Sequence, residues 1–528
     1  MKIREVNIFF FLPFVLVLDI PFIVTALREN TFTSYLAILF SIFFPLVLLQ
    51  LFFYKRPWLF IMLSFPILYL ALSFDVLVFD YNSYYNISTW QAVFDSNPEE
   101  SKEFLGILNY RTWFIGILQI LTYLFYLLWS IKHRIVFSGN LKNWSWHFLA
   151  LIALLFYKGA RMTKAFPFGN TLDSFIAYQK QTELERNLMP IKKTYHYKAT
   201  ENQEFAKDSM PKTIVVLITE SLRRDHQSIY AYPRQTTPLM QNENLIKYTD
   251  LISPANQTVT VLRRVLSQAE GAGDSLYFAR PSIITAFKEA GYRTAWFSTQ
   301  SVGKNGESKN SVIAKESDTT VFHNNTHLDK VLLSDLRNEL SNPATQKLIF
   351  LHVFGVHYLY DHRFPPSNAY FSKQKTSDYK QDQINKYDDA IRYNDYLQSE
   401  ILKLLKQQAG EKIFITFSDH GESLFESAPN IQGHGALQPA KVEFDVPFVL
   451  WFSNEYQKNH PEIYHNVLKN KDLPAINSDF FHSFPYLSGI EFKELKPEKN
   501  FFAPTYKPLQ KRYVLNSGLD SLDYQTLK

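Results

Sequence analysis

Apolar residues concentrate at the N-terminal end of this chain, and their spacing restricts what that part can fold into. Five segments approach the roughly 20 apolar residues that an α-helix needs to cross a bilayer. A single such segment could be a buried helix of a soluble domain, but five in succession favour a membrane domain. We therefore predict five transmembrane helices within residues 1–160. The segments lie at about 7–27, 33–54, 57–80, 112–131 and 145–160, the last being short and aromatic.

Positive charges in the short loops predict the orientation of these helices. Cytoplasmic loops keep an excess of Lys and Arg, and such residues precede the first segment and follow the second and fourth. The loop between the third and fourth segments is mostly acidic. The N-terminus is thus expected inside, and five crossings would place everything after residue 160 outside the cytoplasm. The cations concerned are Lys2, Arg4, Lys55, Arg56, Lys132, Arg134 and Lys142.

Composition excludes some functions for the remainder. The net charge of +5 comes from 55 basic against 50 acidic residues spread along the chain, which is unlike a nucleic-acid-binding surface. We expect no nucleic acid as a partner. Cysteine is absent, so no disulfide stabilises the exported part and no thiol can bind metal or attack a substrate.

The C-terminal part has the pattern of an α/β domain. Residues 161–211 are expected to be a linker with a bridging helix, and residues 212–528 a catalytic domain. In the latter, strand-like and helical runs alternate, which predicts a mostly parallel sheet flanked by helices. The expected strands are 214–219, 294–298, 348–354, 413–417 and 446–452, and the expected helices begin at 258, 282 and 387.

Two of these strands end in side chains that bind metals. Glu220 follows the apolar run that begins at Thr213, and Asp419-His420 follow the run that begins at Lys412. Open α/β sheets bind ligands at the carboxyl ends of their strands. Two carboxylates and an imidazole, with one position left open, are typical of a catalytic zinc site.

A hydroxyl nucleophile is a further candidate. Thr258 stands where a helix is expected to begin, close to an N-cap position. Many threonines there only cap the helix. A hydroxyl at a helix N-terminus is also well placed to attack phosphorus, because the free N–H groups and the helix dipole favour phosphate.

Several longer motifs occur together in one known family. With them the chain resembles, over nearly its whole length, the membrane-anchored phosphoethanolamine transferases of Gram-negative envelopes, which share the alkaline phosphatase/sulfatase fold. The motifs are LITESLRRD at 217–225, YPRQTTP at 232–238, YDDAIRYND at 387–395, SDHGES at 418–423 and GHG at 433–435.

The resemblance implies roles for particular residues. Glu220, Asp419 and His420 match the family's zinc ligands, and Thr258 matches the threonine that carries phosphoethanolamine and also meets the metal. His357 and His434 match histidines that contact the phosphoryl group or a second zinc. Asn97 and Glu100 look like the family's Asn-x-x-Glu motif in a periplasmic loop near the lipid headgroup.

The chain also departs from the family pattern. Members acting on lipid A commonly have Gly-Thr-x-Thr at the nucleophile, several disulfides, and Gly-Pro after the histidine that matches His357. This chain has Gln257-Thr258-Val259-Thr260, no cysteine, and Tyr358-Leu359. Thr260 is therefore an alternative nucleophile, and the branch that modifies other envelope sugars, such as lipopolysaccharide core residues, is favoured.

The function that the resemblance implies is a two-step transfer. Phosphoethanolamine would pass from phosphatidylethanolamine to Thr258 and then to lipid A or a core sugar, with zinc as cofactor and the enzyme in the bacterial inner membrane. A phosphoglycerol transferase of the lipoteichoic-acid or glucan type is the nearest alternative, and a non-catalytic envelope protein is the alternative of another class. A sulfatase activity is disfavoured, since it needs a Cys or Ser converted to formylglycine where this chain has Thr258.

Overall fold

The chain folds into two compact units. The computed structural model describes residues 4–81, 83–95, 108–133, 135–137, 167–206, 210–300, 311–324, 326, 328–427 and 431–528. Among these, residues up to Gln181, apart from Asp95, form the first unit, and residues from Thr182 onward form the second.

The first unit is a bundle of apolar helices. Two of them, α3 (Phe32–Phe52) and α8 (Tyr110–His133), are each long and apolar enough to cross a membrane. Two bent pairs also qualify if each pair is one span: Ile8–Leu18 with α2 (Ile20–Glu29), bent by 66°, and α4 (Pro57–Leu63) with α5 (Phe65–Phe79), bent by 47°. The described residues thus hold two to four candidate spans where the sequence predicted five. The predicted segment at 145–160 lies outside the described residues.

Prolines explain the bends in the paired helices. Pro21 and Pro66 each stand in the first turn after a break, where the missing N–H and the ring interrupt the helix. Inside a membrane the carbonyls freed by a break need other donors. At the break between α4 and α5, the carbonyl of Ile61 accepts hydrogen bonds from the hydroxyl of Ser64 and from the Tyr123 hydroxyl of α8, both at 2.7 Å.

A long helix, α10 (Pro167–Thr194), lies within the predicted linker. It is longer than the helical stretch expected there, which ran from Asp173 to Asn187. Its residues up to Gln181 belong to the first unit and those from Thr182 to the second.

The second unit is built on a seven-stranded sheet. Its strand order is β5-β13-β10-β4-β9-β7-β8. The pairs from β10 to β8 are parallel, whereas β13 pairs antiparallel with both β10 and β5. The sheet is therefore mixed, and the expectation of a mostly parallel sheet holds only for the strands from β10 to β8. The bounds are β5 (Ile246–Lys247), β13 (Phe448–Phe452), β10 (Glu411–Ser418), β4 (Lys212–Thr219), β9 (Gln346–His352), β7 (Arg293–Ser298) and β8 (Thr319–Phe322).

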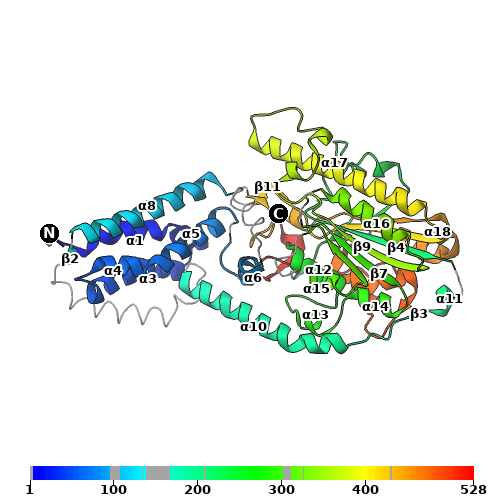
Figure 1. The fold of residues 1–528 in the computed structure, drawn as a ribbon, viewed down its shortest axis with the longest axis horizontal. Helices are drawn as coiled ribbons and strands as arrows, with labels where there is room; N and C mark the ends of the chain where they lie inside the picture. The colour runs from blue at the N-terminus through cyan, green and yellow to red at the C-terminus, as the bar shows by residue number, and fades with distance from the viewer. Residues whose placement is uncertain are drawn as a thin grey trace. The chain divides into compact units, whose positions relative to one another are not determined.

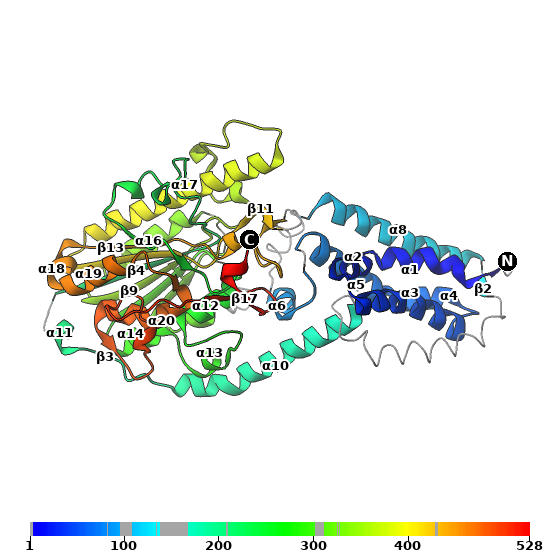
Figure 2. The same cartoon turned by 180° about the vertical axis from the view of Figure 1, so that it is seen from behind.

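Helices cover both faces of this sheet (Figure 1). Val215 and Leu217 of β4 pack with α16 (Leu332–Leu340) and α17 (Tyr379–Lys406) on one face. Ile214, Val216 and Ile218 pack on the other face with α12 (Thr258–Leu266), α14 (Ile283–Glu289) and α20 (Phe480–Ser483). Figure 2 shows these layers from behind. Because successive side chains of a strand point to opposite faces, a strand covered on both faces needs the continuous apolar run that β4 has.

Candidate metal centre and nucleophile

Three neighbouring strands deliver the candidate ligands to one edge of the sheet. β10, β4 and β9 are adjacent and parallel, so their carboxyl ends meet at the same edge. Glu220 follows β4, Asp419 and His420 follow β10, and the turn after β9 leads to His357. This is the edge where open α/β sheets place their ligand sites.

The predicted ligands meet in a compact, buried cluster. One ligand atom each of Glu220, Asp419 and His420 lie within 4.8 Å of one another. Glu220 is 4% exposed, and Asp419 and His420 are fully buried. One oxygen of each carboxylate, Glu220 Oε2 and Asp419 Oδ2, has no hydrogen-bond partner among the described residues. Buried carboxylates need compensation, and a cation at this point would supply it.

The electrostatics of the cluster also favour a cation, because the carboxylate charge of Glu220 is not compensated by the protein. Burial raises the pKa of Glu220 well above its ordinary value, and the neighbouring Asp419 raises it further. Burial lowers the pKa of His420 to about 4, so its imidazole is neutral. His420 Nδ1 lies 2.8 Å from the carbonyl of Gly421 and therefore carries the proton, which leaves the Nε2 lone pair for a metal.

Thr258 lies beside this cluster. Its Oγ1 is 3.4 Å from Glu220 Oε1 and 3.3 Å from His420 Nε2. The residue is the first of α12, and Gln257 is the N-cap, so the helix begins at Thr258 as the sequence predicts, with Thr258 next to the N-cap position. Thr260 is buried, and among the described residues no hydrogen bond joins it to these ligands. The geometry brings Thr258, and not Thr260, to the cluster.

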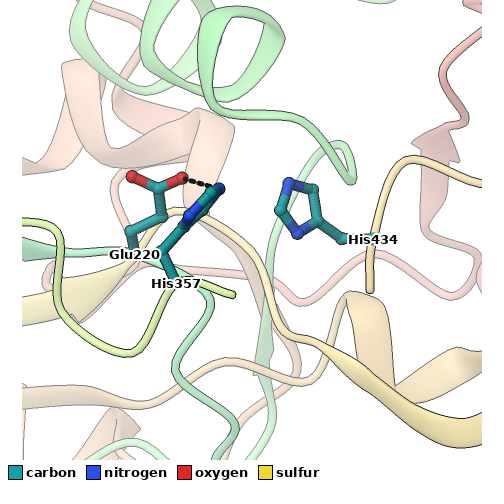
Figure 3. A group of neighbouring side chains, drawn as sticks. All are labelled: Glu220, His357 and His434. Atoms are coloured by element: carbon teal, nitrogen blue, oxygen red, sulfur yellow. Dashed lines mark ion pairs between the residues drawn. The ribbon is translucent and has the colours of Figure 1, made fainter. Parts of the chain in front are cut away.

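His357 and His434 complete the arrangement. Figure 3 shows the carboxylate of Glu220 beside the His357 ring, with His434 on the other side. His357 Nε2 is 3.3 Å from Glu220 Oε1, and the rings of His420 and His434 have centroids 4.0 Å apart. Ligand atoms of Glu220, His357 and His434 also lie within 4.8 Å of one another, so a second cation position is available.

Glu422 orients His434. Its fully buried carboxylate lies 2.8 Å from His434 Nδ1 and accepts a hydrogen bond from the Tyr360 hydroxyl, also at 2.8 Å. Burial alone would lower the pKa of His434, but Glu422, with the more distant Asp419 and Glu443, outweighs burial, and the pKa rises above its ordinary value. Because Nδ1 donates its proton to Glu422, the other ring nitrogen, Nε2, points away from Glu422.

Two charged residues that the sequence did not reveal hold the backbone on either side of His357. Asp329 accepts hydrogen bonds from the backbone N–H groups of Phe354 and Gly355, both at 3.0 Å. Arg363 donates to the carbonyls of His357 at 3.2 Å and Tyr358 at 2.8 Å. Neither residue could be found from a sequence motif. Asp329 binds backbone that is distant in the sequence, and Arg363 binds a segment of irregular structure.

The other predicted site residues, Asn97 and Glu100, lie outside the described residues. Their expected contact with the lipid headgroup stays a prediction.

Comparison with known proteins places the second unit in a family. The sulfatase family profile matches residues 212–490, more than half of the chain. The chain therefore belongs to the sulfatase family. Phosphoethanolamine transferase EptC of Escherichia coli (strain K12) is 25% identical over 484 residues, covering 85% of this chain and 83% of that protein. The resemblance stated from the motifs is thereby confirmed.

Solved structures are similar in fold to this chain. The C-terminal periplasmic domain of Escherichia coli EptC, in complex with Zn, matches with a TM-score of 0.57 at 26% identity, covering 62% of this chain and 96% of that one. The integral membrane lipooligosaccharide phosphoethanolamine transferase A of Neisseria meningitidis matches with a TM-score of 0.66 at 19% identity, covering 96% and 98%. With the apolar helices of the first unit, these relatives agree with the expected inner-membrane location and periplasmic catalytic domain.

Proposed function

We propose that the chain transfers phosphoethanolamine from phosphatidylethanolamine to a saccharide acceptor of the envelope through a phosphothreonine on Thr258. The observation that carries this proposal is the position of Thr258 Oγ1 within 3.4 Å of both Glu220 and His420 at the start of a helix. A threonine used only for capping needs no contact with two candidate metal ligands.

The metal is proposed to be zinc, held by Glu220, Asp419 and His420 with the Thr258 oxygen as a further ligand. The donor set fits: two carboxylates with unpartnered buried oxygens, and one neutral imidazole whose Nε2 faces Thr258 Oγ1 and Asp419 Oδ2. A relative's structure in complex with Zn supports the choice of metal. When bound, zinc lowers the pKa of a coordinated hydroxyl and offsets negative charge on phosphoryl oxygens.

The transfer then takes two nucleophilic displacements at phosphorus. Thr258 Oγ attacks the donor phosphorus, and the bond from phosphorus to the diacylglycerol oxygen breaks, so that diacylglycerol leaves with the proton that the Thr258 hydroxyl gives up. An acceptor hydroxyl or phosphate oxygen next attacks the same phosphorus, the bond between Thr258 Oγ and phosphorus breaks, and Thr258 regains a proton from the acceptor or from water. The free N–H groups at the start of α12 face the phosphoryl oxygens, and His357 and His434 hold those oxygens from the other side.

The test compares two threonines on the same helix. Full-length protein is incubated with phosphatidylethanolamine, and its peptides are mapped by mass spectrometry. Thr258→Ala should abolish the phosphoethanolamine adduct and all transfer, Thr258→Ser should retain both, and Thr260→Ala should retain the adduct. An adduct on Thr260 would refute the choice of nucleophile, and a phosphoglycerol adduct would establish the alternative donor.

A further inference from the structure

A buried glutamate that the proposed transfer does not use contacts two loops of the candidate site. Glu443 is the last residue of η9 (Lys441–Glu443), a short helical turn between the loop of His434 and β13. Its side chain is fully buried. A buried carboxylate needs hydrogen-bond donors around it, so the groups that surround Glu443 show which parts of the chain it holds.

One oxygen of this carboxylate joins the two loops. Glu443 Oε2 accepts a hydrogen bond from Asn256 Nδ2 at 2.9 Å and another from the backbone N–H of Gly435 at 3.2 Å. Asn256 stands two residues before Thr258. Gly435 directly follows His434. The carboxylate therefore links the segment before the candidate nucleophile to the loop that carries one of the site's histidines.

The amide of Asn256 has one favourable orientation. Asn256 is fully buried, and its Nδ2 also donates to the carbonyl of Ala436 at 3.0 Å. Both neighbours of this nitrogen, the Ala436 carbonyl and Glu443 Oε2, are acceptors. Both hydrogen bonds of the amide nitrogen thus connect the segment before Thr258 to the stretch between His434 and Glu443.

The two loops also pack directly on each other. Gly435 has a φ of +78°, and an added Cβ would lie 3.2 Å from Gln257 Nε2. Gln257 is the N-cap of α12 and precedes Thr258. The hydrogen bond between Gly435 and Glu443 thus fixes the loop at the point where it touches the start of this helix.

The backbone around Glu443 contacts a third segment of the site. The N–H of Gly421 donates to the carbonyl of Glu443 at 2.8 Å. An added Cβ on Gly421 would lie 2.0 Å from the carbonyl oxygen of Val442. Because Gly421 directly follows His420, this turn is in close contact with the segment of a candidate metal ligand. The contact uses backbone atoms, so a change of the Glu443 side chain leaves its partners in place.

A glutamate suits this position better than a glutamine. Glu443 Oε1 accepts a hydrogen bond from the backbone N–H of Ala440 at 3.0 Å, so N–H donors face both carboxylate oxygens. A carboxylate has only acceptors, whereas a glutamine amide carries an NH2 group in place of one oxygen. In either orientation of that amide, the NH2 group would face another N–H group. The surroundings of Glu443 therefore require a carboxylate.

We propose that Glu443 is a positioning residue for the transfer, because its carboxylate holds the segment before Thr258 and the loop after His434 at a fixed separation. The inference rests on the transfer proposed above. Glu443 acts through these two segments and not on phosphorus. A misplacement of reacting groups by about 1 Å can slow a reaction by on the order of 100-fold. Loss of the carboxylate should therefore lower kcat while the metal ligands keep their places.

Two substitutions interrupt the link at different points. Glu443→Gln sets an NH2 group against an N–H group. Asn256→Ala removes the hydrogen bonds from the segment before Thr258 and leaves the one between Glu443 and Gly435. If both residues act through one link, the double variant should be no slower than the slower single variant, because the effects of residues that act as a unit are not additive.

Each substitution has a matched control in the second unit. Glu411 is 2% exposed and accepts a hydrogen bond from Asn459 Nδ2 at 2.8 Å, at the start of β10. Asn470 is 3% exposed, and its Nδ2 donates to two backbone carbonyls, those of Phe501 at 3.2 Å and Ala503 at 2.7 Å. Glu411→Gln and Asn470→Ala therefore make the same chemical changes at other buried positions.

Kinetics and metal content are measured on the full chain in detergent, below the unfolding temperature of each variant. The probe is phosphatidylethanolamine, and the Thr258 adduct is followed by mass spectrometry. In Glu443→Gln and Asn256→Ala, kcat and the rate of adduct formation should fall at least about tenfold. The KM for phosphatidylethanolamine and the zinc content should stay within about twofold of the parent values. Both controls should keep the parent kinetics and zinc content.

Hydrogen exchange gives a readout that needs no catalysis. Backbone N–H groups of peptides that contain residues 256–258 and 434–436 should exchange at least about tenfold faster in Glu443→Gln than in the parent chain, because the two segments are no longer held together. In Glu411→Gln these peptides should exchange at the parent rate.

The outcomes separate positioning from a merely structural role. Unchanged kcat in Glu443→Gln, an equal loss of kcat in Glu411→Gln, or a loss of zinc as large as the loss of kcat would each overturn the positioning role. Absence of any adduct in the parent chain would overturn the transfer proposal, and the exchange measurement would then decide whether Glu443 holds the two segments together.

Discussion

The buried carboxylates of Glu220 and Asp419 lie side by side, and the position of both residues in the site could be predicted from the sequence. Both side chains stand immediately after apolar strands, so their position at the edge of the sheet follows from the strand pattern. Asp329 and Arg363 are also buried near the same cluster, but they bind backbone: Asp329 binds the turn before His357, and Arg363 binds the carbonyls of His357 and Tyr358. Such contacts depend on how the turn folds, and no spacing in the sequence predicts them.

The carboxylate pair gives a prediction at the residue scale. Glu220→Gln keeps the shape of the side chain but removes one negative charge. Zinc content per chain, measured by elemental analysis, should fall below one tenth of the parent value, and transfer should fall at least about 100-fold. After removal of metal by a chelator, the variant should unfold at a higher temperature than the metal-free parent, because one like-charge repulsion is gone.

The control is Glu455→Gln, which alters a half-exposed surface glutamate and should change neither metal content nor activity. Full zinc occupancy in Glu220→Gln would refute the assignment of Glu220 as a ligand.

The turn after β9 is the element on which the site depends most. It brings Gly355 against the backbone of Glu220, where an added Cβ would lie 2.8 Å from the Glu220 N and 2.9 Å from its O. The apolar pattern predicted β9 itself, together with β4, β7 and β10, because strands covered on both faces need continuous apolar runs. It did not predict that β13 runs antiparallel, since burial on both faces does not depend on strand direction. The two-residue β5 is too short for any pattern.

Gly355→Ala tests this turn. The φ of Gly355 is +58°, a conformation that costs an L-residue about 1–2 kcal/mol. Overpacking against Glu220 should cost a further 1–3 kcal/mol, roughly. Gly271→Ala is the matched control, because Gly271 has a similar φ of +54° but open space around its Cβ position.

Chemical unfolding of the two variants separates the terms. In Gly271→Ala the free energy of unfolding should fall only by the cost of the positive φ, and the zinc content should be unchanged. In Gly355→Ala the free energy of unfolding should fall further, and most of the zinc should be lost. Equal losses in the two variants would show that the turn does not need to approach Glu220 so closely.

At the scale of the whole molecule, the number of membrane crossings decides where the catalytic unit lies. The positive charges of Lys2 and Arg4 predict a cytoplasmic N-terminus. The described residues contain at most four candidate spans, and four crossings would return the chain to the cytoplasm after His133. A periplasmic catalytic unit, as in the relatives, needs an odd number. The sequence predicts the apolar segment at 145–160 as the remaining crossing, and this prediction concerns residues outside the described ones.

Reporter fusions test this count. A reporter that is active only in the periplasm should be inactive when fused after His133, at the end of α8, and active when fused after Tyr195, just beyond α10. A second reporter, active only in the cytoplasm, should give the opposite pattern, which controls for expression. Replacing Leu151 and Leu154 by Lys should abolish periplasmic activity of the Tyr195 fusion, because each central lysine costs about 2.5–3.5 kcal/mol of insertion free energy. Periplasmic activity after both His133 and Tyr195 would contradict the orientation, and inactivity after both would contradict the fifth crossing.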